Sequence, residues 1–301
     1  MYDVVIVGSG PAGLTAALYA SRYNLKTIVV SKDKGGTLAK APKIENWPGI
    51  KAISGMELMQ QLETQVKELG TEFSLGEVVN VSKHNNAFKI LTQAEEYNSK
   101  FLLLATGCKR RSLGVAGEKE FYGKGVSYCA TCDAPLFKDK VVAVVGGSNA
   151  AAVSAELLSN YAAKVYIIYR RERIRADPLL RGRIEDNTKI EIITSSNIVE
   201  ICGNKFVSSV KLDKGNELKV DGVFIEIGSE PCVELAKQLG VKLDSQGFIV
   251  VDSSQKTTMP NVYAAGDNTT SSNKFEQAIT AAAEGAIAAS SIYEESKRFP
   301  S

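Results

Sequence analysis

Two cysteines separated by two residues form the most reactive group in the sequence. Cys129-Ala-Thr-Cys132 is followed directly by Asp133. A disulfide within so short a segment removes little conformational entropy from the unfolded chain, so it stabilises a fold poorly and suits thiol exchange. The alternatives are half of a zinc site or an inert pair. A zinc site needs two further ligands, and the sequence has no second Cys-x-x-Cys and one histidine, His84.

A nucleotide-binding pattern follows the cysteines. Residues 140–145 are strand-like, the glycine turn 146–151 opens a helix of small residues, and residues 164–169 predict a second strand. This is a βαβ unit of the kind that binds dinucleotides. A dithiol beside a dinucleotide site suggests that electrons pass between a nicotinamide and sulfur.

The second strand of this unit ends in arginines, which are Arg170, Arg171 and Arg175. A ribose 2′-phosphate needs cationic partners, and arginine can bind it bidentately. Glu172 and Asp177 lie close by, so a solvated turn is the alternative. The position at the end of the strand favours the phosphate interpretation, and it predicts NADPH rather than NADH.

A second glycine motif lies near the N-terminus. Residues 4–7 predict a buried strand, Gly8-Ser-Gly-Pro-Ala-Gly13 follows, and residues 12–23 predict a helix. The glycines allow a tight turn, close approach of a pyrophosphate and close helix packing, while the helix N-terminus faces the phosphate charge. The motif is weak alone but stronger when a strand and a helix frame it.

The next strand, residues 27–30, departs from the usual pattern. A carboxylate normally holds the ribose at its end, but Ser31 and Lys32 stand there and Asp33 comes slightly late. A serine hydroxyl binds a ribose hydroxyl more weakly than a carboxylate does.

Two further segments support an open α/β sheet. Residues 261–267 predict a strand, a glycine turn and the carboxylate of Asp267, at the strand end where ligands bind in such sheets. Residues 54–70 predict a helix, because Ser54 and Glu57 have the spacing of a capping box.

The composition is that of an ordinary globular protein. The 301 residues are 44% hydrophobic and 23% charged, with a net charge of +2, which gives no electrostatic case for nucleic acid or an anionic membrane. No apolar stretch is long enough to span a bilayer. The N-terminus enters the glycine motif directly, so we expect no signal peptide and a cytoplasmic protein. Five cysteines form a poor disulfide framework.

These patterns predict an α/β fold with two Rossmann-like nucleotide-binding domains, the second inserted in the first. Residues 1–112 and 243–301 are expected to form the first domain, and 113–242 the inserted domain with the dithiol. The chain is expected to cross between the domains near 113–117 and 240–244.

Together the motifs resemble the low-molecular-weight thioredoxin reductases. The resemblance covers nearly the whole chain, in the family's order: Gly8–Gly13, Gly35–Leu38, Glu45–Gly49, Ala105–Gly107, Cys129–Asp133, Tyr169–Arg171 with Arg175, Val262–Asp267 and Gln277–Ile279. It implies FAD on the first domain, NADPH on the second, a homodimer, and thioredoxin or a glutaredoxin-like protein disulfide as substrate.

The resemblance also implies which residues carry these roles. FAD would lie against Gly8, Ser9, Gly10, Pro11, Ala12, Gly13, Ser31, Lys32, Gly36, Thr37, Leu38, Asn46, Val79, Ala105, Thr106, Gly107, Gly266, Asp267, Gln277, Ala278 and Ile279. NADPH would lie against Gly147, Ser148, Asn149, Ala150, Ile227, Gly228 and the three arginines. Cys132 would face the flavin, Cys129 would attack the substrate disulfide, and Asp133 would transfer protons. The inserted domain would rotate, so that the flavin meets dithiol and nicotinamide in turn, with the glycine-rich crossings near 113–117 and 240–244 as hinges.

The sequence departs from the family at several positions. Ser148 replaces a usual glycine, Val153-Ser154 replace a frequent Glu-Glu, and Thr37 replaces a usual glutamine. These changes motivate two alternatives. One is a flavin-dithiol reductase of the same fold that uses a donor other than NADPH, and the other is a non-catalytic nucleotide-binding module.

Overall fold

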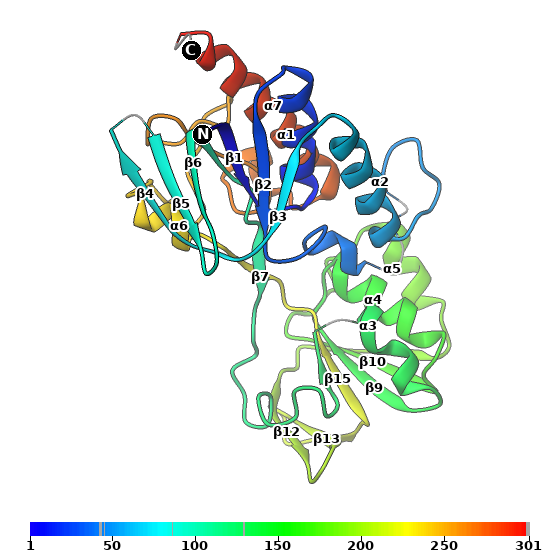
Figure 1. The fold of residues 1–301 in the computed structure, drawn as a ribbon. Coiled ribbons are helices and arrows are strands. Elements are labelled where there is room, and N and C mark those ends of the chain that lie inside the picture. Colours follow the sequence, from blue (N-terminus) through cyan, green and yellow to red (C-terminus); the bar gives the residue numbers. More distant parts are fainter. Residues whose placement is uncertain (42–43, 45, 86, 129, 299–301) are drawn as a thin grey trace. The chain divides into compact units, whose positions relative to one another are not determined.

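The computed structural model describes residues 1–41, 44, 46–85, 87–128 and 130–298 of the chain. These residues divide into two compact units, coloured along the chain in Figure 1. Unit 1 comprises Met1–Lys109 and Glu230–Ser301, and unit 2 comprises Arg110–Ser229. The fold is α/β, and the second unit is inserted in the first.

The unit boundary on the return of the chain lies earlier than the sequence suggests. It falls between Ser229 and Glu230 rather than near residue 242. The short helix α6 (Glu234–Gln238) is the reason, because it packs on unit 1. The side chain of Gln238 accepts a hydrogen bond from Val81 N at 2.9 Å and donates one to Val79 O at 3.1 Å.

Unit 1 is built on a seven-stranded sheet in the order β3-β2-β1-β6-β5-β4, in which β17 also pairs with β6. The pairs β1–β2, β1–β6, β2–β3 and β6–β17 are parallel, and β4–β5 and β5–β6 are antiparallel. The strands are β1 (Tyr2–Val7), β2 (Thr27–Ser31), β3 (Glu72–Leu75), β4 (Val78–His84), β5 (Ala87–Thr92), β6 (Glu96–Leu104) and β17 (Val262–Ala264). The helices are α1 (Pro11–Arg22), α2 (Gly55–Glu68) and α7 (Ala278–Ser296), with 3-10 turns η1 (Leu38–Lys40) and η3 (Ser271–Lys274).

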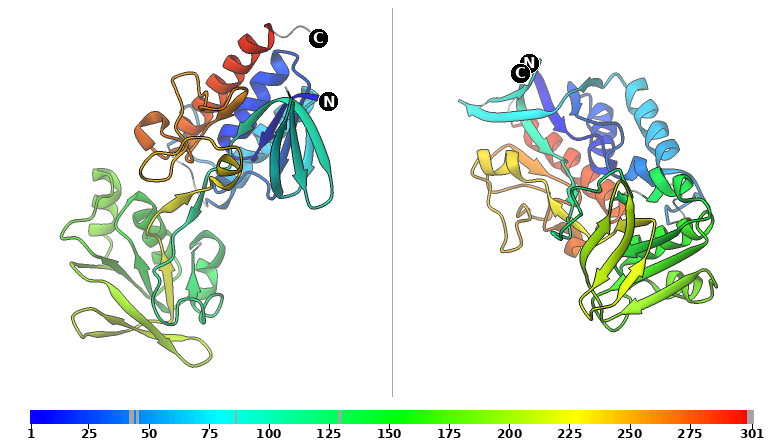
Figure 2. Two further views of the ribbon diagram at one scale, coloured as in Figure 1. Left: turned by 90° about the vertical axis from the view of Figure 1, so that its left-hand side faces the viewer. Right: turned by 90° about the horizontal axis from the view of Figure 1, so that it is seen from below.

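Alternate residues of the central strands feed two separate cores. Val4, Ile6 and Leu103 face the alanine-rich sides of α1 and α7, which lie side by side in Figures 1 and 2. Val5 and Leu104 face the opposite way, toward α6 and Ile249. A parallel strand that is buried on both faces reads as a continuous apolar run, which is why residues 4–7 were predictable as a strand.

The two long helices of unit 1 approach each other closely because their contact residues are small. A Cβ atom added to Gly285 of α7 would lie 2.1 Å from the carbonyl oxygen of Ala12 in α1. Farther along, the rings of Tyr23 and Tyr293 stack with centroids 4.5 Å apart. The small residues therefore fix α7 against the start of α1.

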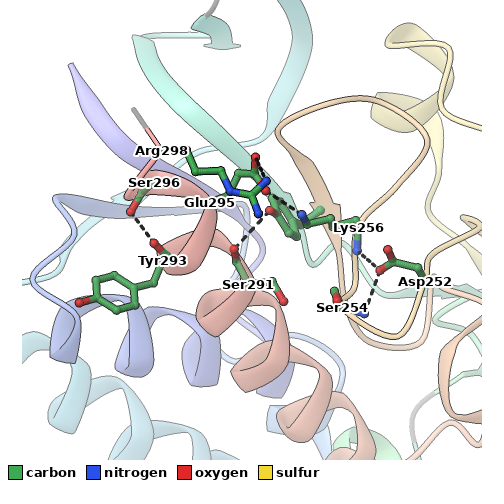
Figure 3. Close-up of polar contacts among 9 residues, drawn as sticks. Asp252, Ser254, Lys256, Ser291, Tyr293, Glu295, Ser296 and Arg298 are labelled. Atoms are coloured by element: carbon green, nitrogen blue, oxygen red, sulfur yellow. Dashed lines mark hydrogen bonds and ion pairs between the residues drawn. The ribbon is translucent and has the colours of Figure 1, made fainter. Parts of the chain in front are cut away.

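Polar contacts hold the C-terminal part of α7 to the loop that precedes β17 (Figure 3). Lys256 Nζ lies 2.7 Å from Glu295 Oε2, and Asp252 Oδ1 accepts hydrogen bonds from the backbone N–H groups of Ser254 and Lys256. Tyr263 OH also reaches Ser291 O at 3.4 Å. The loop and the helix are thereby joined.

Unit 2 contains a five-stranded parallel sheet in the order β11-β10-β9-β15-β8. A three-stranded antiparallel sheet, β12-β13-β14, accompanies it. The strands are β8 (Val126–Ser127), β9 (Val141–Val145), β10 (Lys164–Tyr169), β11 (Ile190–Thr194), β12 (Ile198–Gly203), β13 (Val207–Leu212), β14 (Glu217–Lys219) and β15 (Gly222–Ile225). The helices are α3 (Ala130–Asp133), α4 (Asn149–Ser159) and α5 (Pro178–Glu185), with the 3-10 turn η2 (Ala134–Phe137). At the crossings, β7 (Cys108–Arg110) pairs with β16 (Ser229–Pro231).

The parallel sheet of unit 2 is covered on both faces. Val144 and Ile167 pack with Leu158 of α4, and Val145 and Ile225 pack with the antiparallel strands. The fold therefore contains the two nucleotide-binding βαβ units that the glycine motifs predict.

One local prediction is confirmed at the start of α2. The Ser54–Glu57 capping box forms at the start of α2, where Ser54 Oγ accepts from Glu57 N at 3.2 Å. Within the described part of the chain, no helix combines the length and apolarity needed to cross a bilayer.

The close contact between α1 and α7 gives a first prediction. Gly285→Ala should lower the free energy of unfolding by about 1–3 kcal/mol, because the new methyl group has no space. Alanine has the higher helix propensity, so propensity alone predicts the opposite sign. Ser290→Ala, a half-buried position of the same helix, is the control and should change stability by no more than about 0.5 kcal/mol. Urea unfolding measures both, and an unchanged Gly285→Ala midpoint would contradict the close packing.

Candidate functional site

The turn between β1 and α1 leaves no room for side chains at two of its glycines. Gly8 has φ +113°, and a Cβ atom there would lie 2.2 Å from Ala105 O. A Cβ atom on Gly13 would lie 1.9 Å from Gly8 O. Gly10, by contrast, has open space where its Cβ atom would be. No side chain caps the N-terminus of α1, so its first N–H groups are available to an anion. This cradle fits a pyrophosphate.

A buried hydroxyl group holds this turn to the end of β2. Ser9 Oγ donates to Asp33 O at 2.7 Å and accepts from Gly35 N at 3.0 Å. It also lies 3.1 Å from Ser31 Oγ. The serine that replaces the usual carboxylate is therefore part of a network that joins the two glycine turns. Lys32, beside it, forms an exposed ion pair with Glu77 at 3.5 Å.

Gly36, Thr37 and Leu38 lie next to this cradle. A Cβ atom on Gly36 would be 3.2 Å from Gly10 Cα, so the second glycine turn packs on the first. Thr37 is the N-cap residue of η1, and Leu38 O sits against the start of α2, where a Cβ atom on Gly55 would be 1.9 Å away. The backbone of this segment is thus held from both sides.

Asp267 lies at the end of β17, as predicted, and a second acid supports its turn. The backbone N–H of Gly266 donates to Glu284 Oε2 at 2.7 Å, and Thr269 Oγ1 also lies 3.3 Å from this oxygen. Burial, together with the neighbouring charges of Glu276 and Glu284, raises the pKa of Asp267 from 3.8 to about 7. A carboxyl group with a pKa near neutrality is suited to hydrogen-bond a neutral hydroxyl group.

Glu284 was not among the predicted site residues. It is 4% exposed and lies in the alanine-rich helix α7. An isolated acid within a run of alanines is a signal that could have identified it, since charged residues are seldom fully buried without partners.

The residues expected near the flavin are partly brought together. Asn46 Nδ2 donates to Gln277 Oε1 at 3.1 Å, and Gln277 caps α7 ahead of Ala278 and Ile279. Val79, expected to line the adenine pocket, lies on β4 and is 45% exposed.

Thr106 and Gly107 lie in unit 1, shortly before the chain passes into unit 2. Thr106 Oγ1 donates to Cys232 O at 2.7 Å and accepts from Asn268 Nδ2 at 2.9 Å. Gly107 O accepts from Cys232 N at 2.9 Å. These two predicted flavin-site residues therefore also fasten the returning chain.

The glycine turn of unit 2 is equally confined. Gly146 has φ +145°, and a Cβ atom there would lie 2.1 Å from Glu226 O. A Cβ atom on Gly147 would lie 2.6 Å from the ring of Tyr169. Ser148 precedes α4 and makes no capping hydrogen bond with its side chain, which leaves the N–H groups of the first turn for a ligand.

The replacement of a usual glutamate at position 154 has a counterpart in the fold. Ser154 Oγ donates to Glu226 Oε1 at 2.8 Å, and both side chains are buried. Glu226 follows β15 and lies beside the Gly146 turn. A carboxylate is therefore still present next to α4, but it belongs to the residue that follows β15.

The predicted arginines follow β10 in a segment that folds back on the glycine turn. Arg175 N donates to Gly147 O at 2.6 Å, and its Nε donates to Tyr169 OH at 2.9 Å. Asn149 Nδ2 donates to Asp177 Oδ2 at 2.6 Å and fixes the end of this segment. Arg170 and Arg171 are exposed and make no ion pair with any residue that the structure describes.

The dithiol segment follows β8 after one residue, Tyr128. Cys129, predicted as catalytic, lies outside the described residues, and of Cys132 the backbone is described, within α3. Asp133 ends this helix and is half-buried. Ile227 and Gly228 follow Glu226, and Gly228 O accepts from Arg111 N at 2.9 Å. Among the described residues there is no group of three or more histidine, cysteine or acidic side chains that could hold a metal ion.

The raised pKa of Asp267 gives a second prediction. The unfolded carboxyl group loses its proton near pH 4 and the folded one near 7, so the folded state binds more protons in between. Stability of the FAD-free protein should therefore fall as the pH rises from about 4 to about 7. Asp267→Asn removes this penalty and should raise the unfolding free energy at about pH 8 by roughly 2–4 kcal/mol, but not at about pH 4. Thermal unfolding across the pH range measures it; an equal effect at both pH values would refute the assignment.

Comparison with known proteins agrees with this geometry. The family model described as pyridine nucleotide-disulphide oxidoreductase matches residues 2–285. The thioredoxin reductase of Listeria innocua is 37% identical over 295 residues, which are 96% of this chain and 92% of the relative.

Solved structures agree as well. The thioredoxin reductase of Lactococcus lactis has a TM-score of 0.96 and 35% identity, over 99% of this chain and 100% of that one. A ferredoxin-flavin thioredoxin reductase from Clostridium acetobutylicum has a TM-score of 0.53 and 33% identity, over 99% of this chain and 98% of that one. The chain belongs to the pyridine nucleotide-disulphide oxidoreductase family and is an oxidoreductase.

Proposed function

We propose that the protein is an NADPH-dependent thioredoxin-disulfide reductase that uses FAD. The supporting observation is the shared edge of the parallel sheet in unit 2. The carboxyl ends of β8, β9 and β10 lead into the dithiol segment, the Gly146 turn and the arginines. Parallel strands end at one edge, so a dinucleotide and a dithiol would be presented from the same side of one unit.

In this proposal unit 1 holds FAD. The Gly8–Gly13 cradle would bind the pyrophosphate, Asp267 a hydroxyl group of the ribityl chain or a phosphate, and Asn46 with Gln277 would lie near the flavin ring. The flavin, when bound, supplies a two-electron relay between the nicotinamide and the dithiol.

The dithiol would carry the electrons to the substrate. The Cys129 thiolate would attack the substrate disulfide and form a mixed disulfide, and Cys132 would displace the substrate and close the Cys129–Cys132 bond. Asp133 would donate or accept the proton, since the sequence contains one histidine. The net reaction is NADPH + H⁺ + protein disulfide → NADP⁺ + protein dithiol, which balances in atoms and electrons.

A second candidate is the same flavin-dithiol enzyme with another electron donor. The departures from the family at the nucleotide turn favour it: Ser148 stands where a glycine is usual, and Val153-Ser154 replace a frequent Glu-Glu. One solved relative with this fold, from Clostridium acetobutylicum, carries ferredoxin rather than NADPH in its name. A homodimer belongs to the proposal through the resemblance, and light scattering of the holoprotein tests it. A cytoplasmic location belongs to it through the pattern of the N-terminal residues.

An anaerobic titration of the FAD-loaded protein with NADPH tests the function. We expect the flavin absorbance to bleach and thioredoxin disulfide to be reduced. Cys132→Ser should still bleach with NADPH but should lose thioredoxin reduction, because the dithiol can no longer form. Cys202→Ser, which changes a free cysteine of β12, is the matched control and should keep both activities.

Two results would contradict this function. A protein that stays yellow with NADPH but bleaches with dithionite needs a different donor, and a reduced ferredoxin is then the next reagent. A protein that takes up no flavin would be the non-catalytic module.

The exposed arginines give a further prediction about the nucleotide. Arg171→Ala should raise the KM for NADPH by about tenfold to a hundredfold and leave the KM for NADH nearly unchanged, because it removes a charge-assisted contact to the 2′-phosphate. Arg173→Ala is the control, since Arg173 is exposed in the same segment but is not among the predicted ligands. Equal effects of the two substitutions would mean that general positive charge, rather than a phosphate site, is responsible.

A further inference from the structure

A buried carboxylate in unit 2 lies outside the nucleotide site and the dithiol. Glu118 is 2% exposed, and its two oxygens accept hydrogen bonds from three neutral donors. Leu113 N and Tyr128 OH lie 2.7 and 2.5 Å from Oε1, and Gly114 N lies 2.6 Å from Oε2. Burying a carboxylate costs free energy unless hydrogen-bond donors surround it. The three donors are therefore needed to stabilise Glu118 in its buried position.

One of the donors directly precedes the dithiol. Tyr128 stands between β8, whose Val126 and Ser127 pair with Val223 and Phe224, and Cys129. Burial and the bond to Glu118 raise the pKa of the Tyr128 phenol, which therefore keeps its proton and stays a donor. The segment that leads into the dithiol is thus held by the backbone pairing of β8 with β15 and by the hydrogen bond of the Tyr128 phenol to Glu118.

The other two donors belong to the segment by which the chain enters unit 2. Beyond them, Ile201 N donates to Ala116 O at 2.9 Å, and a Cβ atom on Gly117 would lie 2.0 Å from Ile201 O. The segment from Leu113 onward is therefore part of unit 2. The crossing near residues 113–117, expected from the resemblance to be a hinge, is tied down, and any pivot must precede Leu113.

We propose that Glu118 is a positioning residue for the dithiol, because its carboxylate fastens Tyr128 to the entering segment Leu113–Gly114. The inference rests on the proposed function. In that function the dithiol and the nicotinamide must each meet the flavin, so the dithiol has to move with the entering segment as one body. Without the bond, the dithiol segment would have additional positions, of which few are reactive.

The test compares two steps of the FAD-loaded holoprotein. Tyr128→Phe should slow NADPH-driven reduction of thioredoxin by about tenfold or more, while the single-turnover bleaching of the flavin by NADPH changes by less than about twofold. Glu118→Gln should act in the same way, because the amide has one acceptor oxygen and its NH2 group cannot accept the remaining hydrogen bond. The double variant should be no slower than the slower single variant, since both substitutions break one interaction.

A second readout does not depend on activity. Hydrogen exchange of the amides in residues 126–134 should become faster in both variants, while exchange in β9 and β10 stays as in the wild type. Tyr122→Phe is the matched control, because Tyr122 is 65% exposed and contacts the Tyr128 ring without donating to Glu118.

The outcomes are distinct. Equal slowing of both steps would show a general structural role, and unchanged thioredoxin reduction with unchanged exchange would show no role; either overturns the inference. If NADPH fails to bleach the wild-type flavin, the proposed donor is wrong. In that case dithionite-reduced flavin replaces NADPH as the electron source, and the same comparison of variants still decides the role of Glu118.

Discussion

The site depends on two turns at which no side chain fits. A Cβ atom on Gly8 would collide with the carbonyl oxygen of Ala105, and one on Gly146 with that of Glu226. Ala105 and Glu226 each directly follow a neighbouring strand of the sheet. Both glycines also have positive φ angles. The strand, the turn and the following helix are consequently held together by contact between backbones, which places the helix N-terminus at the carboxyl edge of each sheet. A pyrophosphate can approach because the turn itself presents N–H groups.

Buried carboxylates stabilise three further segments of the two units. Glu284 binds the turn before Asp267, Glu226 accepts from Ser154 beside the second glycine turn, and Glu118 joins Tyr128 to the entering chain. Each accepts from neutral N–H or O–H donors. A buried acid of this kind tolerates few alternatives, because removing one donor leaves a charge without compensation. These segments are therefore fixed by side-chain hydrogen bonds between residues that lie 4 to 72 positions apart in the sequence.

Long-range contacts also decide where the units are divided. The glycine-rich segment near Leu113 has the composition of a hinge, but Glu118 fastens it to unit 2. The segment before Gly240 likewise belongs to unit 1, because α6 packs on its core and Gln238 bonds to β4. A glycine-rich composition indicates that a segment can bend, but its packing and hydrogen bonds determine whether it is free to do so.

The sequence by itself determined the two βαβ units, the dithiol and the arginines at a strand end, because hydrophobic periodicity and glycine spacing are local properties. Helix α2 and its capping box were predictable for the same reason. Only the tertiary structure revealed that Ser31 is bound to Ser9, that the residue after β15 supplies the acid missing from α4, and that Glu118 holds Tyr128. These pairs join residues that lie up to 72 positions apart, and the sequence pattern does not encode which buried donor meets which acceptor.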